Sequence, residues 1–289
     1  MRIVAKAIPT GAALGADIVD IDLSDELGAD DLEAIKQAWA EHLVLRFRGQ
    51  HLSDEDLLRF SRHFGPLDKA PINPYGTTWV PDNPEVNVIS NILDDTGKRI
   101  GGLGDGECVW HADMTYNDDP VHACTLYAKE IPEIGGDTGF ANMVAAYEAL
   151  SDELKVRLTG MECKHDKTRN STGQLRKGFE ESYPDVSHVP GAVHPMVRRD
   201  PETGRCALYP GRRHNAYVLG LSVDESEALL DEIWAHVSKP EFAWTQHWQV
   251  DDLVMWDNRY CLHRRDAFSP DARRHMRRTQ IGGDRPVAA

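Results

Sequence analysis

The sequence is poor in positive charge and has no long apolar run. Its 289 residues include 32 Lys and Arg against 47 Asp and Glu, which gives a formal net charge of −15 at pH 7. Nucleic-acid binding needs a positive surface, so we expect no nucleic-acid partner. No apolar run reaches the roughly 18 residues of a membrane-spanning helix, and no basic segment precedes an apolar stretch at the N-terminus. We therefore expect a soluble protein with no membrane partner.

Cysteine is also scarce. The chain has five cysteines, an odd number, and no Cys-x-x-Cys pair. This pattern excludes a dense disulfide framework and the common zinc-ribbon site, and it suits a reducing compartment. We expect a cytoplasmic protein.

One short motif stands out among the residues that are present. Trp110-His111-Ala112-Asp113 contains the single His-x-Asp of the chain. Residues two apart on an extended strand point to the same face, so His111 and Asp113 could both reach one metal ion. His263 is the best candidate for a third ligand, which would complete the facial triad of non-haem Fe(II) oxygenases. A His-x-Asp alone is equally typical of an ordinary polar strand end.

Basic residues recur near the C-terminus. If residues 273–281 form a strand, Arg274 and Arg278 share one face, and both guanidinium groups could point into the same cavity. The alternative is a solvated basic run. Thr138, which follows the tight turn at Gly135-Gly136, offers a hydroxyl donor as a second anchor. An Arg fork together with a Thr hydroxyl suits a terminal carboxylate.

Together these patterns resemble the TauD/TfdA family of Fe(II)- and 2-oxoglutarate-dependent dioxygenases, which includes the taurine and phenoxyacetate herbicide enzymes. The similarity covers nearly the whole chain, beginning with Gly-x-x-Leu-Gly-Ala at residues 11–16. The motifs that carry it are Trp110-His111-Ala112-Asp113, Gly136-Asp137-Thr138, Trp256-Asp257-Asn258 ahead of His263, and the pair Arg274 and Arg278.

The resemblance implies a role for each of these residues. His111, Asp113 and His263 would be the catalytic iron ligands. Thr138 and Arg274 would hold the distal carboxylate of 2-oxoglutarate, the cosubstrate that reacts with O2. Arg278 matches a family position associated with an acidic group and would contact the substrate. Trp256 would form a wall of the pocket.

Two departures from the family bear on the substrate. Ala70 stands where taurine enzymes carry a sulfonate-binding His, and Asn73 stands where they carry an aromatic residue, so taurine is not favoured. Glu107 lies four residues before His111, where relatives often have Asn. We expect Glu107 to contact an amine or hydroxyl of the substrate; the alternative is a solvent-facing loop residue.

The fold we expect is α+β and mainly β. The resemblance implies a double-stranded β-helix, a cupin-like jelly roll with flanking helices. Because the candidate ligands lie at positions 111 and 263, we expect residues 1–289 to form a single domain. Periodicity and capping predict helices over 29–40 and 57–64, with further helices after Asn142 and Ser222. Residues 164–189 are either a lid or a plain exposed loop.

The predicted function is hydroxylation of a small anionic substrate, with an aryloxyalkanoate-like carboxylate favoured and cleavage of the product possible. A sulfonate, a phosphonate or an amino-acid derivative is the alternative within the family. Arg212 or Arg213 could contact an anionic substrate, although adjacent Arg residues after Pro-Gly are often on the surface. A non-catalytic cupin-like sensor or a zinc hydrolase would use the same three ligands. We expect a homo-oligomer, either dimer or tetramer, because these are common in the family.

Overall fold

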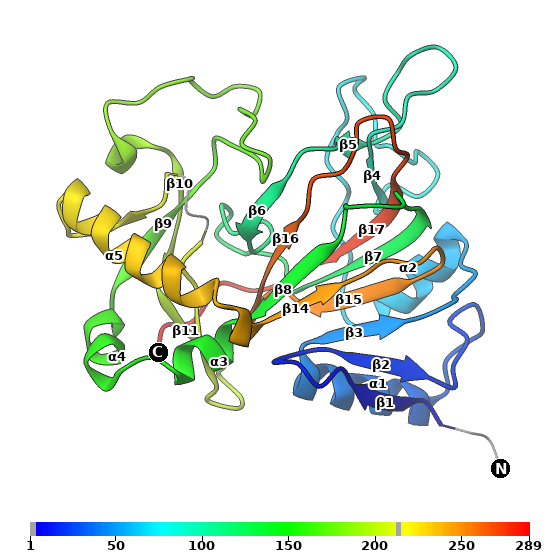
Figure 1. The fold of residues 1–289 in the computed structure, drawn as a ribbon, viewed down its shortest axis with the longest axis horizontal. Coiled ribbons are helices and arrows are strands. Elements are labelled where there is room, and N and C mark those ends of the chain that lie inside the picture. The colour runs from blue at the N-terminus through cyan, green and yellow to red at the C-terminus, as the bar shows by residue number, and fades with distance from the viewer. Residues whose placement is uncertain (1–3, 212–214) are drawn as a thin grey trace.

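The computed structural model describes residues 4–211 and 215–289 and is built around two β-sheets (Figure 1). The large sheet has eight strands, which lie side by side in this order: β1 (Lys6–Pro9), β2 (Ala16–Val19), β3 (Val44–Phe47), β15 (Leu253–Asp257), β7 (Ala123–Glu130), β17 (His275–Ile281), β4 (Asn87–Ser90) and β5 (Gly102–Leu103). The small sheet has four strands in the order β14 (Ala243–Gln246), β8 (Thr138–Asn142), β16 (Cys261–Arg265) and β6 (Cys108–His111).

Strand β15 shows how the large sheet is buried on both faces. Val254 and Trp256 belong to the core between the sheets, where the Trp256 ring lies 5.5 Å from that of Phe140 on β8. Leu253 and Met255 point to the opposite face and pack in a second apolar cluster with helices α1 (Ala29–His42) and α2 (Asp54–Arg62). A strand covered on both faces is apolar along most of its length, as β15 is from Leu253 to Trp256. The sheet pair with helices outside confirms the predicted jelly-roll fold.

The helix starts follow local capping chemistry. Ser53 and Ser222 each form a capping box, at the start of α2 and of α5 (Val223–Val237) respectively. The Asn142 side chain accepts hydrogen bonds from two backbone N–H groups of α3 (Met143–Glu148). These predicted helix starts are confirmed. None of the helices in the described ranges has the length and apolarity needed to cross a bilayer.

The remaining elements lie beside the small sheet, on the side away from the large one (Figure 1). Helix α5 crosses this region together with α3. The other elements are α4 (Asp152–Leu158), β9 (Glu162–Asp166), η1 (Val186–His188), β10 (Gly191–Pro195), β11 (Val197–Arg199), β12 (Cys206–Leu208), β13 (Tyr217–Val218) and η2 (Pro240–Phe242). The segment 164–189 therefore begins inside strand β9 and is not wholly a loop.

Candidate active site

The three candidate metal ligands meet in the structure. Strands β6 and β16 pair with His111 opposite His263, and the two ring centroids lie 4.2 Å apart. Asp113 places Oδ1 3.6 Å from His111 Nε2 and Oδ2 3.5 Å from His263 Nε2. All three side chains are buried, and their ligand atoms lie within 4.8 Å of one another. Two imidazoles and one carboxylate in this arrangement fit a single divalent metal ion with an open face.

The backbone that presents Asp113 differs from the extended strand we predicted. Strand β6 ends at His111, and Asp113 opens a turn in which Met114 has a φ of 57°. Asn258, which is fully buried in the turn between β15 and β16, holds this turn. Its Oδ1 accepts from the Asp113 N–H (2.7 Å), and its Nδ2 donates to the Asp113 carbonyl (2.9 Å) and to the Val121 carbonyl (2.8 Å). The position of the carboxylate ligand thus depends on a residue 145 positions away in sequence.

Replacement of Asn258 by alanine is expected to weaken metal binding by about 10- to 100-fold, as is typical for residues that orient metal ligands. The change leaves the Asp113 backbone groups and the Val121 carbonyl without their buried partner, so the free energy of unfolding should also fall. Titration with Mn(II) and chemical denaturation measure the two effects. Asn83→Ala is the control, because the Asn83 amide contacts Glu55 at the surface. Unchanged metal affinity in Asn258→Ala would contradict the role.

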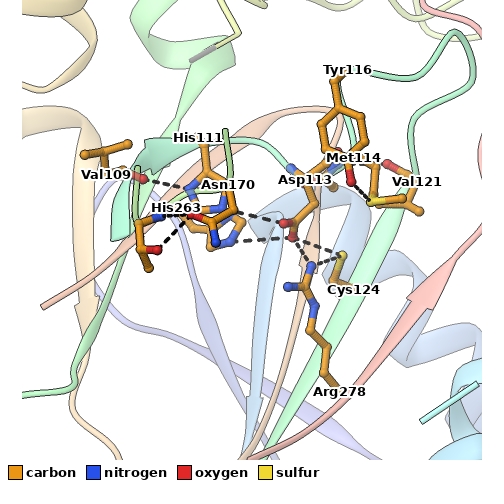
Figure 2. Close-up of polar contacts among 12 residues, drawn as sticks. Val109, His111, Asp113, Met114, Tyr116, Val121, Cys124, Asn170, His263 and Arg278 are labelled. Carbon is orange, nitrogen blue, oxygen red and sulfur yellow. Dashed lines mark hydrogen bonds and ion pairs between the residues drawn. The ribbon is translucent and has the colours of Figure 1, made fainter. Parts of the chain in front are cut away.

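Electrostatics keep Asp113 ionised. Burial opposes its charge, but the Arg278 guanidinium and the two histidines outweigh burial and hold the pKa of Asp113 well below its usual range. Figure 2 shows the Arg278 side chain reaching the Asp113 carboxylate from the side opposite the imidazoles, beside the Cys124 thiol. Burial alone would lower the pKa of Arg278, but Asp113 raises it. Arg278, predicted to contact substrate, therefore has a candidate metal ligand as its partner.

A small cavity of about 40 Å³ extends from the two histidines toward Arg274 and Thr138. Arg274 is fully buried, and its Nε and Nη2 have no hydrogen-bond partner among the described residues. Burial and the nearby Arg265 lower the pKa of Arg274 to about 9. The Thr138 hydroxyl accepts from Trp248 Nε1 (3.1 Å), which leaves its proton available to donate. An unpaired buried guanidinium beside a hydroxyl donor fits a carboxylate ligand.

Glycine at position 136 makes room for this arrangement. Gly136 has a φ of 71°, and a Cβ placed there would lie 3.3 Å from Nε of Arg274 and 2.9 Å from the Pro132 ring. A larger residue would be strained and would push on the guanidinium.

Arg265 also lines the small cavity, together with Arg274 and Arg278, and was not among the predicted site residues. It is buried, and its Nη2 donates to the carbonyls of Leu103 (3.2 Å) and Gly106, whereas Nε and Nη1 have no partner in the described part of the chain. The sequence does contain an indication of this position, because Arg265 lies two residues after His263 on one strand and therefore points to the same face.

A larger cavity of about 340 Å³ adjoins the small one and is lined by His111 and Asp113 of the candidate metal ligands. Its volume is within the range of small-molecule sites. Its walls are aromatic and apolar, with several amides and two Arg side chains. The lining residues are Pro71, Trp79, Asn87, Ile89, Gly102, Leu103, His111, Asp113, Met114, Tyr116, Asn170, Ser171, Arg176, Arg278 and Gln280. Residues 170, 171 and 176 show that the segment 164–189 forms part of the cavity wall.

Some of the predicted substrate contacts lie elsewhere. Glu107 is exposed and lines neither cavity. Arg212 and Arg213 lie outside the described residues. Trp256, predicted to be a pocket wall, lines the small cavity and lies 5.0 Å from the His263 ring.

Known proteins match this chain over nearly its full length. The model of the family described as "Taurine catabolism dioxygenase TauD, TfdA family" matches residues 6–280. The chain belongs to the TauD/TfdA family. It is therefore an oxidoreductase of the dioxygenase type that uses Fe(II), 2-oxoglutarate and O2, and the resemblance drawn from the motifs is confirmed.

Relatives within the TauD/TfdA family include enzymes with different substrates. Pentalenolactone F synthase of Streptomyces avermitilis is 34% identical, with 96% of this chain and 94% of that protein aligned. The alpha-ketoglutarate-dependent 2,4-dichlorophenoxyacetate dioxygenase of Cupriavidus pinatubonensis is also 34% identical, with 99% and 100% aligned. The crystal structure of AAD-2 with Mn(II) and N-oxalylglycine is similar with a TM-score of 0.79 at 27% identity, covering 99% of this chain and 100% of that one.

Proposed function

We propose that this TauD/TfdA dioxygenase hydroxylates a small organic carboxylate of the aryloxyalkanoate type. The observation that supports this most directly is the 340 Å³ cavity, which combines aromatic walls with Arg side chains and opens onto the candidate metal ligands. An aromatic ring suits the Trp79 and Tyr116 walls, and an acidic group suits a cation. The relative from Cupriavidus pinatubonensis, which spans the same length, acts on a phenoxyacetate.

The roles of the residues follow from their positions. His111, Asp113 and His263 would hold Fe(II), while Thr138 and Arg274 would bind the distal carboxylate of 2-oxoglutarate. When bound, the metal and cosubstrate supply the oxidation, in which O2 converts 2-oxoglutarate to succinate and CO2 and one oxygen atom enters a substrate C–H bond. The largely buried walls of the small cavity exclude water from the cosubstrate. Hydroxylation beside an ether oxygen gives a product that breaks down, so an aryloxyalkanoate would be cleaved to a phenol.

Anaerobic reconstitution tests this function. The protein is loaded with Fe(II) and 2-oxoglutarate, and the weak visible metal-to-ligand absorption band is recorded. Oxygen is then admitted with a panel of aryloxyalkanoates, alkylsulfonates, phosphonates and amino acids. We expect the band, followed by succinate formation that aryloxyalkanoates stimulate most, with none when 2-oxoglutarate is omitted.

Other results would redirect the proposal. Strongest stimulation by a sulfonate or an amino acid would replace the aryloxyalkanoate with that class. A protein that binds iron but shows neither band nor succinate would contradict the function as a whole.

We also propose that residues 1–289 form one domain that works as a homo-oligomer, dimer or tetramer, in the cytoplasm. The single domain is supported by the large sheet, which joins strands from both ends of the chain. The cytoplasmic location is supported by the five cysteines, all of which are free thiols, as a reducing compartment favours. Light scattering on the purified protein measures the oligomeric state, and a monomer would contradict the assembly.

A further inference from the structure

The large cavity contains two cations, and only one of them is paired. Arg278 donates to the Asp113 carboxylate and to the Cys124 thiol, so its charge is balanced by a candidate metal ligand. Arg176 lines the same cavity, and no carboxylate of the described residues pairs with it. Arg176 is therefore the cation of this cavity that has no carboxylate partner among the described residues.

Tyr116 orients the Arg176 guanidinium. The Arg176 Cζ lies 3.7 Å from the centroid of the Tyr116 ring, which is a close cation–π contact. The Tyr116 hydroxyl is itself held by the Met114 sulfur at 2.9 Å, as Figure 2 shows. A guanidinium stacked on a ring keeps its N–H donors free at its edge, which is the geometry that a carboxylate recognises with two parallel hydrogen bonds.

The backbone fixes Arg176 relative to the metal ligands. The Ser171 carbonyl accepts from the N–H of Val109 on strand β6 at 3.1 Å, and β6 carries His111. The N–H of Arg176 donates to the Thr168 carbonyl at 2.7 Å, which closes a short loop around Ser171. Tyr116 lies in the turn that begins at Asp113. The stacked pair, His111 and Asp113 are therefore held by the same two segments.

We propose that Arg176 binds the acidic group of the substrate and makes the cavity selective for anions. This inference rests on the proposed function, since it names the residue that recognises the substrate carboxylate. An aryloxyalkanoate anchored at Arg176 would hold the carbon between its carboxylate and its ether oxygen close to that anchor, in the cavity that the candidate metal ligands His111 and Asp113 also line. The rest of the chain is strongly acidic, so a local cation is needed to attract an anion.

The test compares a carboxylate with its uncharged counterpart. The panel acid that the wild type turns over best and its primary amide are assayed with wild type, Arg176→Gln, Arg176→Lys and Lys177→Gln. Lys177 is the matched control, because it is the next residue, is exposed and lines neither cavity. We expect Arg176→Gln to raise KM for the acid by about 10- to 100-fold and KM for the amide by no more than about 2-fold. The KM of Arg176→Lys for the acid should lie between those of the wild type and Arg176→Gln, since lysine keeps the charge but loses the planar stack on Tyr116.

A binding measurement separates recognition from chemistry. In the anaerobic Fe(II) and 2-oxoglutarate complex, addition of the acid should perturb the visible band, and Arg176→Gln should require a correspondingly higher acid concentration. If Arg176→Gln keeps the wild-type preference for acid over amide, Arg176 is not the anion-recognising residue, although the dioxygenase function stands. If the wild type turns over no panel acid, the proposed function and this inference are both wrong.

Discussion

Alanine at His111 or at Asp113 is expected to abolish turnover, and the two variants should differ in stability. Each change removes one of three metal donors whose ligand atoms lie within 4.8 Å of one another. Metal affinity should fall by more than the roughly 100-fold that loss of an orienting residue causes. Metal titration and succinate formation measure these losses.

The difference in stability comes from Arg278. In Asp113→Ala the buried guanidinium of Arg278 loses the carboxylate that balances it, which is expected to cost about 3–5 kcal/mol in the free energy of unfolding. In His111→Ala no buried charge loses its partner, and loss of the ring's hydrogen bond to the Val109 carbonyl at 2.7 Å should cost about 1 kcal/mol, so the total should be smaller than in Asp113→Ala. Chemical denaturation of the metal-free proteins compares the two.

A double variant separates the two effects. Asp113→Ala with Arg278→Met removes the unpaired charge, so stability should recover while activity stays absent. His51→Ala is the control for loss of an imidazole, because the His51 side chain is 84% exposed. Turnover by either single variant would exclude these residues as metal ligands. Equal stability of the two single variants would show that Arg278 does not depend on Asp113.

Local rules predicted the parts of this structure that depend on neighbouring residues. The capping boxes at Ser53 and Ser222 start helices because the interacting residues are only three positions apart. The placement of Arg278 and Gln280 on one face of β17 follows from strand alternation, and both line the large cavity. Spacing of this kind can be recognised from the sequence alone.

Contacts between distant segments could not be predicted in the same way. Strand alternation suggested where Arg278 points, but its partner Asp113 is 165 positions away and became clear only in the structure. Asn258 is a second example. The motif that contains it was recognised in the sequence, but its hydrogen bonds to the Asp113 backbone were not predicted. Glu107 is the opposite case, a residue close in sequence that lies outside the site. It is only four residues before His111, but it is exposed and lines neither cavity.

Replacement of Arg274 by methionine is expected to abolish 2-oxoglutarate binding and, at the same time, to stabilise the ligand-free protein. The Arg274 guanidinium is fully buried with two nitrogens unpartnered. Its pKa of about 9 lies below the unfolded value, so the charged form costs stability at neutral pH, and this cost decreases only as the pH rises to 9 and above. An apolar side chain of similar length removes that cost, and a gain of about 1–4 kcal/mol in the free energy of unfolding is expected.

Ligand binding should offset this difference in stability. A ligand at 100 times its Kd stabilises the folded state by about 2.7 kcal/mol, and the wild type should gain this from 2-oxoglutarate while Arg274→Met gains nothing. Thermal unfolding with Mn(II), with and without 2-oxoglutarate, measures both effects. The control is Arg273→Met, since Arg273 is exposed and pairs with Glu130 at 2.7 Å. If Arg274→Met were still stabilised by 2-oxoglutarate, the carboxylate would bind elsewhere. If Arg274→Met were less stable than the ligand-free wild type, the buried guanidinium would have a partner even without the ligand.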